Sequence, residues 1–400
     1  MWSTRSSWKY IQWLSYRSLS YGTTDYLTVH DNAVARYAKK EPKKHTINQL
    51  IQFGKQLNEQ KLIQSARFVH QELPVRLAHR IIDLRSLPYY VVCGPIKRIY
   101  DVYVEAFESV RNFRKIQDLQ DEKEFTVLLK HLVDESANVV ELLAHGLRLA
   151  LLRASQREHL DLDSFVDQML ISRIGRRMIA EQHVMLHESR PGFVGVINTH
   201  CSPQQCLDIA YQECSRICFR QYGVQVPVQI RGSVSTIPYI PYHLHYILLE
   251  LLKNSMRAVV ERHLSQNHHK NGLLLSKDNM PPIEVLLTEG PKQVTIRISD
   301  QGGGIALDIL SSIFRYGFST VNRLREEEQG GGNLGGEWDR LVQRQSVDGP
   351  MAGLGFGLPL SKLYAQYFGG NLQLVSMDGY GTDVYVHLDR TGDVLEGVEI

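Results

Sequence analysis

Three polar side chains share one face of a segment, residues 243–264, whose apolar pattern predicts a helix. Glu250, Asn254 and Arg257 follow one another at intervals of four and three residues, so an α-helix places them on the same side. Leucines between them supply the apolar remainder. A face that carries a carboxylate, an amide and a guanidinium can hold a ligand or can simply be solvated. The segment alone leaves both possibilities open.

An aspartate stands where a strand is expected to end. Residues 293–299 alternate as a strand does, and Asp300 follows directly, with Gly302, Gly303 and Gly304 after it. Glycines let the backbone approach a flat ligand closely. The carboxylate can accept a hydrogen bond from an exocyclic amine such as that of adenine. An ordinary glycine turn is the alternative.

Glycines recur before a second expected helix, residues 358–369. The run Gly353–Leu358 alternates glycine with apolar residues, and Pro359 stands near the first helical position. Exposed N–H groups at such a helix start can cradle a phosphate. No Lys-Ser or Lys-Thr pair follows, so this is not a Walker A loop. A G-x-G-x-x-G match at Gly330 follows a charged loop rather than a strand, and we interpret it as part of a flexible lid.

These residues must be positioned by helices and strands, and the type of secondary structure that the sequence predicts changes near residues 188–192. Before that point, apolar residues recur at helical spacing and no strand pattern occurs, which predicts a helical bundle. Pro74 lies inside one of these segments, where a proline should bend or break the helix. The expected helices cover residues 61–86, 95–113, 121–154 and 161–187.

After the change, strand-like runs alternate with helical ones, which predicts an α/β or α+β layer structure. The expected strands are 193–198, 226–231, 283–288, 293–299, 371–377 and 383–388, and the expected helices are 203–222, 243–264 and 358–369. Segments 267–282 and 323–350 are polar or glycine-rich and predict loops.

The amino-acid composition argues against several classes of protein function. The chain has 400 residues, 43% of them apolar and 22% charged, which suggests roughly two domains with cores of their own. A net charge of +2 argues against a dominant nucleic-acid or membrane-surface role. No run approaches the ~20 apolar residues of a membrane span.

Two further stretches have a distinctive composition. Residues 1–24 contain Arg5, Lys9 and Arg17, several serines and no acid, which favours a mitochondrial transit peptide over a disordered basic arm. Four of the five cysteines lie within residues 201–218. They lack the C-x-x-C pairs of zinc sites, which predicts buried thiols rather than a metal centre.

In their order and spacing, these segments resemble the N, G1, G2 and G3 boxes of the GHKL ATPases, which include gyrase, heat-shock chaperones and histidine kinases. The strings QELPVRLAHRI, SRIGRRMIAEQHVMLHE, LELLKNSMRAVVE, RISDQGGGI and LGFGLPLSKLYAQYFGG resemble the mitochondrial pyruvate and branched-chain 2-oxoacid dehydrogenase kinases in particular. The resemblance covers about residues 45–390. It implies a helical (four-helix) bundle over 25–190, a GHKL-type mixed α/β sandwich ATPase domain over 191–390 and a short C-terminal tail over 391–400.

The resemblance also implies roles for individual residues. Glu250 would be the general base that takes the proton from the attacking serine hydroxyl. Asn254 would bind Mg²⁺, and Asp300 would read adenine. The cofactors would be ATP and Mg²⁺. The implied ATP-binding residues are Asn254, Arg257, Ala258, Asp300, Gly302, Gly304, Ser319, Thr320, Gly353, Leu354, Gly355, Phe356, Gly357, Leu358 and Thr382.

The activity implied by the resemblance is that of a serine kinase of the mitochondrial matrix. It would phosphorylate and inactivate the dehydrogenase α subunit of a 2-oxoacid dehydrogenase complex, with pyruvate dehydrogenase as the leading substrate and the branched-chain enzyme as the alternative. The lipoyl domain of the acyltransferase core would dock on the helical domain, and the kinase would form a homodimer. Neither nucleic acid nor membrane insertion is expected.

Two departures from the family and two other classes of function stay open. Tyr246 stands where many pyruvate dehydrogenase kinases have a histidine, with His245 beside it, and the tail lacks the Asp-Trp pair found in several of them. A histidine autokinase would need an acceptor such as His70. A degenerate ATP-binding domain could serve only as a scaffold.

Overall fold

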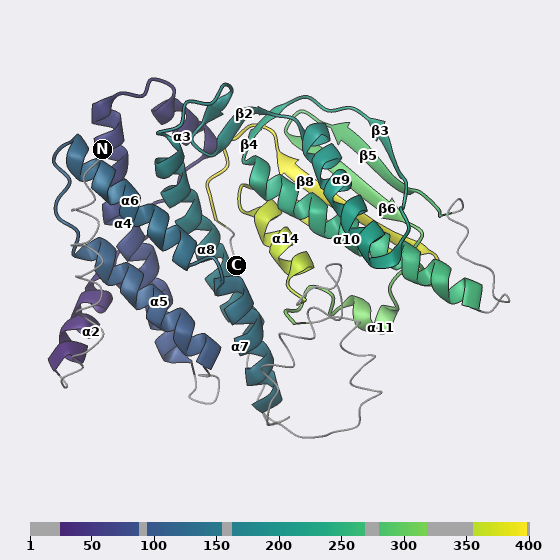
Figure 1. Cartoon of the computed structure of the whole chain (residues 1–400), viewed down its shortest axis with the longest axis horizontal. Coiled ribbons are helices and arrows are strands. Elements are labelled where there is room, and N and C mark those ends of the chain that lie inside the picture. The colour runs from purple at the N-terminus through teal and green to yellow at the C-terminus, as the bar shows by residue number, and fades with distance from the viewer. Residues whose placement is uncertain (1–24, 88–93, 154–161, 269–279, 318–354, 398–400) are drawn as a thin grey trace, which may run out of the picture.

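The computed structural model describes residues 25–87, 94–153, 162–268, 280–317 and 355–397 (Figure 1). The expected transit peptide, residues 1–24, and most of the two expected loops lie outside this part of the chain. Within the described residues, no helix is long and apolar enough to cross a bilayer.

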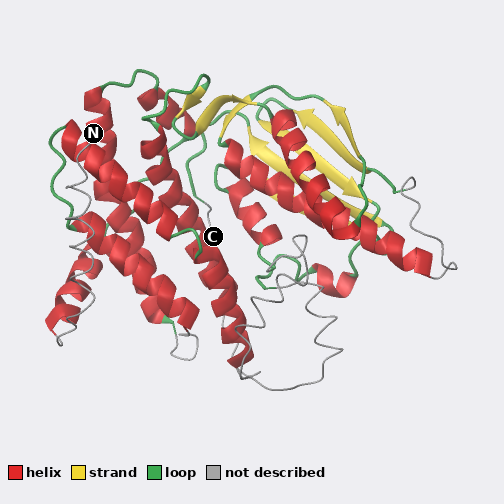
Figure 2. Cartoon of the chain, in the orientation of Figure 1, coloured by secondary structure: helices red, strands yellow, loops and turns green. Residues whose placement is uncertain are grey.

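The N-terminal part of the described chain is helical (Figure 2). Asn58 caps α4 by accepting a hydrogen bond from the Lys61 N–H, and Asp118 caps α6 in the same way through Asp121; such caps satisfy N–H groups that a helix start leaves unpaired. The helices are α2 (Asp25–Ala38), α3 (Ile47–Gly54), α4 (Glu59–Ser86), α5 (Gly94–Arg111), α6 (Leu119–Glu135), α7 (Val139–Arg153) and α8 (Leu162–Met185).

Two helix predictions need correction. Helix α4 runs unbroken through Pro74, whose side chain is buried, so packing of α4 against α5 and α8 outweighs the lost backbone hydrogen bond. The expected single segment 121–154 is two helices, α6 and α7. At the break, the Ser136 hydroxyl donates to the Val133 carbonyl at 3.0 Å, a local bond that competes with helix continuation.

The C-terminal part is a mixed sheet with helices packed against it, which confirms the coarse architecture expected from the sequence. Its five-stranded sheet has the order β3-β5-β6-β8-β7, with β3 and β5 parallel and the other neighbours antiparallel. The strands are β3 (Val228–Gly232), β5 (Ile283–Glu289), β6 (Gln293–Asp300), β7 (Asn371–Met377) and β8 (Gly381–Asp389).

Helices α9 (Pro203–Tyr222), α10 (Pro241–His268) and α14 (Gly357–Gln366) lie on one side of this sheet, and a single turn, α11 (Leu307–Leu310), follows β6 (Figure 1). A small second sheet, β1 (Phe193–Val194), β2 (Ile197–Cys201) and β4 (Ile237–Tyr239), leads from the helical part into this layer. The sequence pattern did not reveal β4.

Cysteine burial agrees with the sequence-based expectation. Cys201, Cys206, Cys214 and Cys218 are all buried free thiols in the core. Burial raises the pKa of Cys214 to about 12. These thiols therefore pack as small apolar groups.

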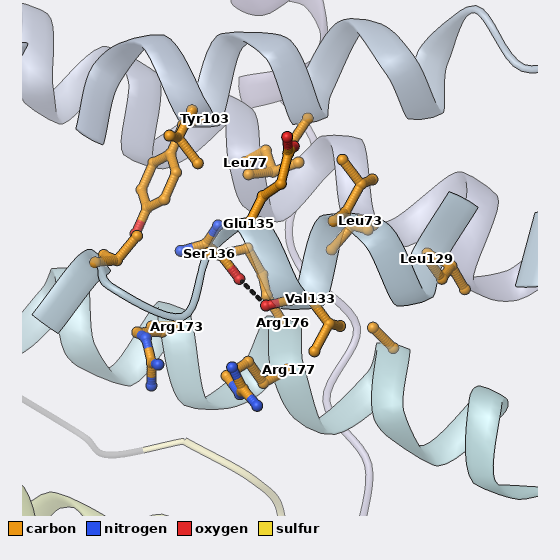
Figure 3. A pocket seen from close by; sticks show the side chains of 15 residues that line it. Leu73, Leu77, Tyr103, Leu129, Val133, Glu135, Ser136, Arg173, Arg176 and Arg177 are labelled. Atoms are coloured by element: carbon orange, nitrogen blue, oxygen red, sulfur yellow. Dashed lines mark hydrogen bonds between the residues drawn. The ribbon is translucent and has the colours of Figure 1, made fainter. Parts of the chain in front are cut away.

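A pocket lies inside the helical part, between α4, α5, α6 and α8 (Figure 3). Its wall is mostly apolar, with Arg173, Arg176 and Arg177 of α8 on one side and Glu135 of α6 also lining it. The Arg176 guanidinium lies 4.0 Å from the centre of the Tyr103 ring, a cation–π contact. None of the residues with an expected nucleotide role lines this pocket.

Candidate functional site

Glu250 and Asn254 lie one turn apart on α10, as their spacing predicted. The Glu250 carboxylate is largely buried, with 15% of its side chain exposed, and its Oε1 lies 2.6 Å from the Lys253 ammonium. Asn254 is exposed. The face thus offers a carboxylate that is largely shielded from water and, beside it, an amide open to a ligand.

The start of α14 packs directly on Glu250. A methyl group at Gly357 would lie 2.2 Å from Oε2 of Glu250, so an alanine there would have to displace either the carboxylate or this backbone. Gly355 adopts a positive φ of 76°, which a glycine does at little cost, and its carbonyl accepts from the Gly317 N–H at 3.3 Å. The unpaired N–H groups of the helix start are therefore held close to the carboxylate.

Asp300, at the end of β6, occupies a buried polar pocket. Its Oδ1 accepts from the Gly302 N–H at 2.9 Å and its Oδ2 from the Ser255 hydroxyl at 3.0 Å. Burial raises the pKa of Asp300, and these hydrogen bonds oppose the shift. On the neighbouring strand, Thr382 lies opposite Asp300.

The glycines after Asp300 permit close backbone packing. A methyl group at Gly302 would meet Cβ of Ala258 at 2.4 Å, and one at Gly304, whose φ is 74°, would meet the Met377 carbonyl oxygen at 2.0 Å. The glycine run therefore fits tightly between α10 and the end of β7. The alternative of an ordinary surface turn does not describe this segment.

Three residues that support the site were missed from the sequence. Ser255 orients Asp300, as described above. Ser376 accepts from the Ile305 N–H at 2.7 Å and lies 3.0 Å from the Thr382 hydroxyl. Arg262 donates to the carbonyls of Gln301, at 3.0 Å, and of Gly379, at 2.8 Å. Their positions carry no sequence pattern that could have suggested them.

The surroundings of Tyr246 show how this chain differs at the position four residues before Glu250. Tyr246 stacks at 5.1 Å on Tyr364 of α14, and burial together with the Glu250 charge raises its pKa. His245 points elsewhere, with Nε2 3.2 Å from Oε2 of Glu213 on α9. His245 therefore does not replace a histidine beside the carboxylate.

Some of the remaining residues with an expected ATP-binding role lie in the part of the chain that the structure describes, and others do not. Arg257 pairs with Glu261 one turn along α10, at 2.7 Å. Phe356 is buried and stacks on Tyr316 at 4.9 Å, and Leu358 packs partly buried at the start of α14. The positions outside the described residues are Ser319, Thr320, Gly353 and Leu354.

The segment after α11 in the sheet domain touches the helical part. The Arg315 guanidinium lies 3.1 Å from the Asp163 carboxylate, and the Tyr316 hydroxyl donates to Asp167, both acids being on α8. Tyr316 in turn stacks on Phe356. A contact path therefore runs from the loop before α14 to the long helix α8.

Two family models match separate parts of the chain. Residues 44–198 match the family model described as mitochondrial branched-chain alpha-ketoacid dehydrogenase kinase. Residues 240–392 match the model described as histidine kinase-, DNA gyrase B- and HSP90-like ATPase.

Individual relatives match over most of the chain. A mitochondrial pyruvate dehydrogenase (acetyl-transferring) kinase of Arabidopsis thaliana is 40% identical over 358 residues, which cover 88% of this chain and 91% of the relative. The corresponding kinase of Ascaris suum is 33% identical, with 89% and 86% covered. Isozyme 4 of Homo sapiens is 31% identical, with 89% and 83% covered.

Proposed function

The chain belongs to the family of mitochondrial pyruvate and branched-chain 2-oxoacid dehydrogenase kinases, and from this premise we propose that it phosphorylates pyruvate dehydrogenase. It is an ATP-dependent protein kinase with a GHKL-type nucleotide domain. The observation that carries the proposal is the contact of the largely buried Glu250 carboxylate with the glycine start of α14. This contact brings a proton acceptor to the place where phosphate would bind.

The proposed chemistry assigns Glu250 as the base. Its carboxylate takes the proton of the attacking serine hydroxyl as the bond to the γ-phosphorus forms and the bond to ADP breaks. The Lys253 ammonium lies 2.6 Å from Oε1 of this carboxylate and holds it in place. The helix start and its glycines hold the phosphates through N–H groups.

Adenine would be recognised by Asp300, at the other end of the site from Glu250. Asp300 accepts a hydrogen bond from the exocyclic amine, held in position by Ser255 and the Gly302 N–H. Gly302 and Gly304 let the backbone beside Asp300 pack closely against Ala258 and Met377, and Thr382, opposite Asp300 on β8, would lie near the ring. The residues that the structure does not describe, Ser319, Thr320, Gly353 and Leu354, complete the proposed phosphate site.

The donor set around α10 fits Mg²⁺. Asn254 is exposed on the same face as Glu250, and an amide oxygen is a hard ligand of the kind this ion accepts. We propose Asn254 as its protein ligand. When bound, Mg²⁺ would supply positive charge that offsets the phosphate oxygens.

The proposed setting is the mitochondrial matrix, with residues 1–24 as the transit peptide. Residues 25–190 would form the regulatory domain on which the lipoyl domain of the acyltransferase core docks, and residues 191–390 the kinase domain. The protein would act as a homodimer on the dehydrogenase α subunit.

The proposal is tested by incubating the purified chain with Mg-ATP and either the pyruvate or the branched-chain dehydrogenase complex. We expect acid-stable phosphate on a serine of the pyruvate dehydrogenase α subunit, together with loss of dehydrogenase activity. Preference for the branched-chain complex, whose kinase gives its name to the matching N-terminal model, would reassign the substrate. Acid-labile phosphate on the kinase itself would instead indicate a histidine autokinase.

A further inference from the structure

We infer that the helical part holds a binding site for a zinc-like divalent cation, formed by Glu122, His183 and His187. Glu122 comes from α6, His183 from α8, and His187 from the turn that follows α8. One ligand atom from each residue lies within 4.8 Å of the other two, and this is the single such group of His, Cys, Asp or Glu in the described residues. It lies in the helical part, away from the nucleotide residues.

The three side chains of this cluster are mostly buried. Glu122 and His183 are fully buried, and the His187 side chain is 28% exposed. A buried carboxylate and a buried imidazole are costly unless they are paired or bind a metal. The partial exposure of His187 gives an ion a way in from solvent.

Distances at the cluster suit a tetrahedral ion. Nε2 of His183 lies 3.2 Å and Nε2 of His187 lies 2.7 Å from Oε1 of Glu122. Ligand atoms about 2.0–2.1 Å from a tetrahedral zinc are roughly 3.3 Å apart. The first distance already fits, and the second requires the more exposed imidazole to move by about half an ångström.

Hydrogen bonding alone does not account for the arrangement. Both imidazole nitrogens and the Thr126 hydroxyl, at 3.0 Å, crowd on Oε1 of Glu122. Its other oxygen, Oε2, is buried and has no hydrogen-bond partner among the described residues. The Thr126 hydroxyl also lies 3.0 Å from Nε2 of His183 and 3.5 Å from Nε2 of His187, so the two imidazole nitrogens have partners whereas Oε2 has none. The three potential ligand atoms lie within 4.8 Å of one another, and with a carboxylate oxygen left over they form a donor set that can hold a cation.

The Ser65 side chain orients the imidazole of His183. Nδ1 of His183 lies 2.9 Å from the Ser65 hydroxyl on α4. When Nδ1 carries the proton and donates it to Ser65, Nε2 presents its lone pair to the cluster, as zinc-bound histidines do. Two histidines and one carboxylate leave a coordination position for water, the donor set of borderline zinc-like ions rather than of Mg²⁺. Such an ion would link α6 to α8 and to the start of the sheet domain.

The test uses the full chain, without an affinity tag and stripped of metal with a chelator, in the absence of nucleotide. Zinc binding is measured by calorimetry and by metal analysis after dialysis, and Co²⁺ serves as a spectroscopic probe. We expect one zinc per chain, a higher thermal midpoint with zinc, and visible Co²⁺ bands typical of a tetrahedral site with nitrogen and oxygen ligands.

The variant His187→Gln should weaken zinc binding at least tenfold and abolish the thermal shift. Because His187 is partly exposed, this variant should keep the circular dichroism and ATP binding of the parent, and Glu122→Gln serves as the second variant. The matched control is His131→Gln, since His131 forms an exposed pair with Glu135 on the same helix, 3.7 Å apart, without a third ligand; it should bind zinc like the parent.

Three outcomes would overturn the inference. They are no saturable zinc binding by the parent, parent-like binding by both His187→Gln and Glu122→Gln, or a cobalt spectrum with thiolate charge-transfer bands. The last result would place the ion at cysteines instead.

Discussion

At the scale of single residues, Glu250 and Asn254 occupy different surroundings although they are one turn apart. The Glu250 carboxylate is shielded and paired with Lys253, whereas Asn254 is exposed. A shielded carboxylate suits proton transfer, and an exposed amide suits a hydrated cation. Substitutions at the two positions should therefore have separable effects.

Replacing the base should affect chemistry alone. We expect Glu250→Gln to lower kcat by about 10²–10⁴-fold and to leave the Kd for Mg-ATP nearly unchanged, because glutamine keeps the shape but cannot take a proton. Asn254→Ala should instead weaken Mg-ATP binding. Single-turnover phosphorylation and nucleotide titration measure the two effects. Glu284→Gln, at an exposed carboxylate, is the control, and full activity in Glu250→Gln would remove the base assignment.

Asp300 gives the site a pH dependence of known sign. Its folded-state pKa lies above the ordinary value of 3.8 because of burial, so the folded protein binds this proton more tightly than the unfolded chain does. Below the ordinary pKa, this tighter proton binding contributes its full amount to the free energy of unfolding. The contribution is lost as the pH rises through the raised, folded-state pKa of Asp300. Because an asparagine side chain does not titrate, Asp300→Asn should remove this loss of stability at higher pH.

We thus expect Asp300→Asn without nucleotide to be at least as stable as the parent at neutral pH, with the difference shrinking toward pH 4. Its ATP affinity should fall at least about tenfold, since a buried polar contact to adenine is lost. Thermal unfolding across pH and nucleotide titration are the measurements. A variant that discriminates ATP from GTP as the parent does would contradict adenine reading by Asp300.

At the scale of elements, the contact between α10 and α14 positions the site. The helix that carries the proposed base and the helix start that would hold phosphate meet at Gly357, where a methyl group would lie 2.2 Å from Oε2 of Glu250. The ring contact between Tyr246 and Tyr364 ties the same two helices together, and the contact between Tyr316 and Phe356 joins the start of α14 to the segment after α11. Catalytic geometry therefore depends on packing as much as on the identity of the base.

Gly357→Ala should displace the Glu250 carboxylate or the start of α14 from their present contact. Because a displacement of about 1 Å can cost about 10²-fold in rate, we expect a large loss of kcat with a retained fold. Gly94→Ala, at the start of α5, is the matched control, since a methyl group there would meet nothing within 4 Å. Steady-state kinetics and circular dichroism compare the two. Equal activity of both variants would mean that α14 tolerates the shift.

At the scale of the whole molecule, the C-terminal segment joins the two parts of the chain. Glu396 is buried, and its Oε1 lies 2.7 Å from the Arg76 guanidinium of α4. Tyr367, just after α14, donates a hydrogen bond to the same carboxylate. A segment expected only to be a short tail thus brings a negative charge to a buried arginine of the helical part.

Removing one partner of such a buried pair leaves an uncompensated charge, which typically costs about 3–5 kcal/mol. We expect Glu396→Ala to lower the free energy of unfolding by an amount near the bottom of that range, because Glu72 still pairs with Arg76 at 3.1 Å. Glu124→Gln, which breaks an exposed pair with Arg114, should cost less than about 1 kcal/mol. Denaturant unfolding of both variants gives the comparison, and similar small losses would show that the tail is not a structural link.

The sequence determined much of this description because its signals are local. Helical and strand periodicity placed most elements within a few residues, and the α10 spacing put Glu250 and Asn254 on one face. It failed at Pro74 and at Ser136, where packing and a local hydrogen bond decide the outcome. It also missed Ser255 and Ser376, because an isolated serine carries no pattern.

Contacts between distant segments depended on the tertiary structure alone. The sequence indicated a nucleotide domain after a helical one, since glycines and carboxylates at strand and helix ends have meaning at short range. It could not show that Gly357 touches Glu250 or that Glu396 reaches Arg76, 320 residues earlier. Nor could it gather Glu122 and His183 at one point. Such pairings follow from how whole helices and strands pack, which residue spacing along the chain does not encode.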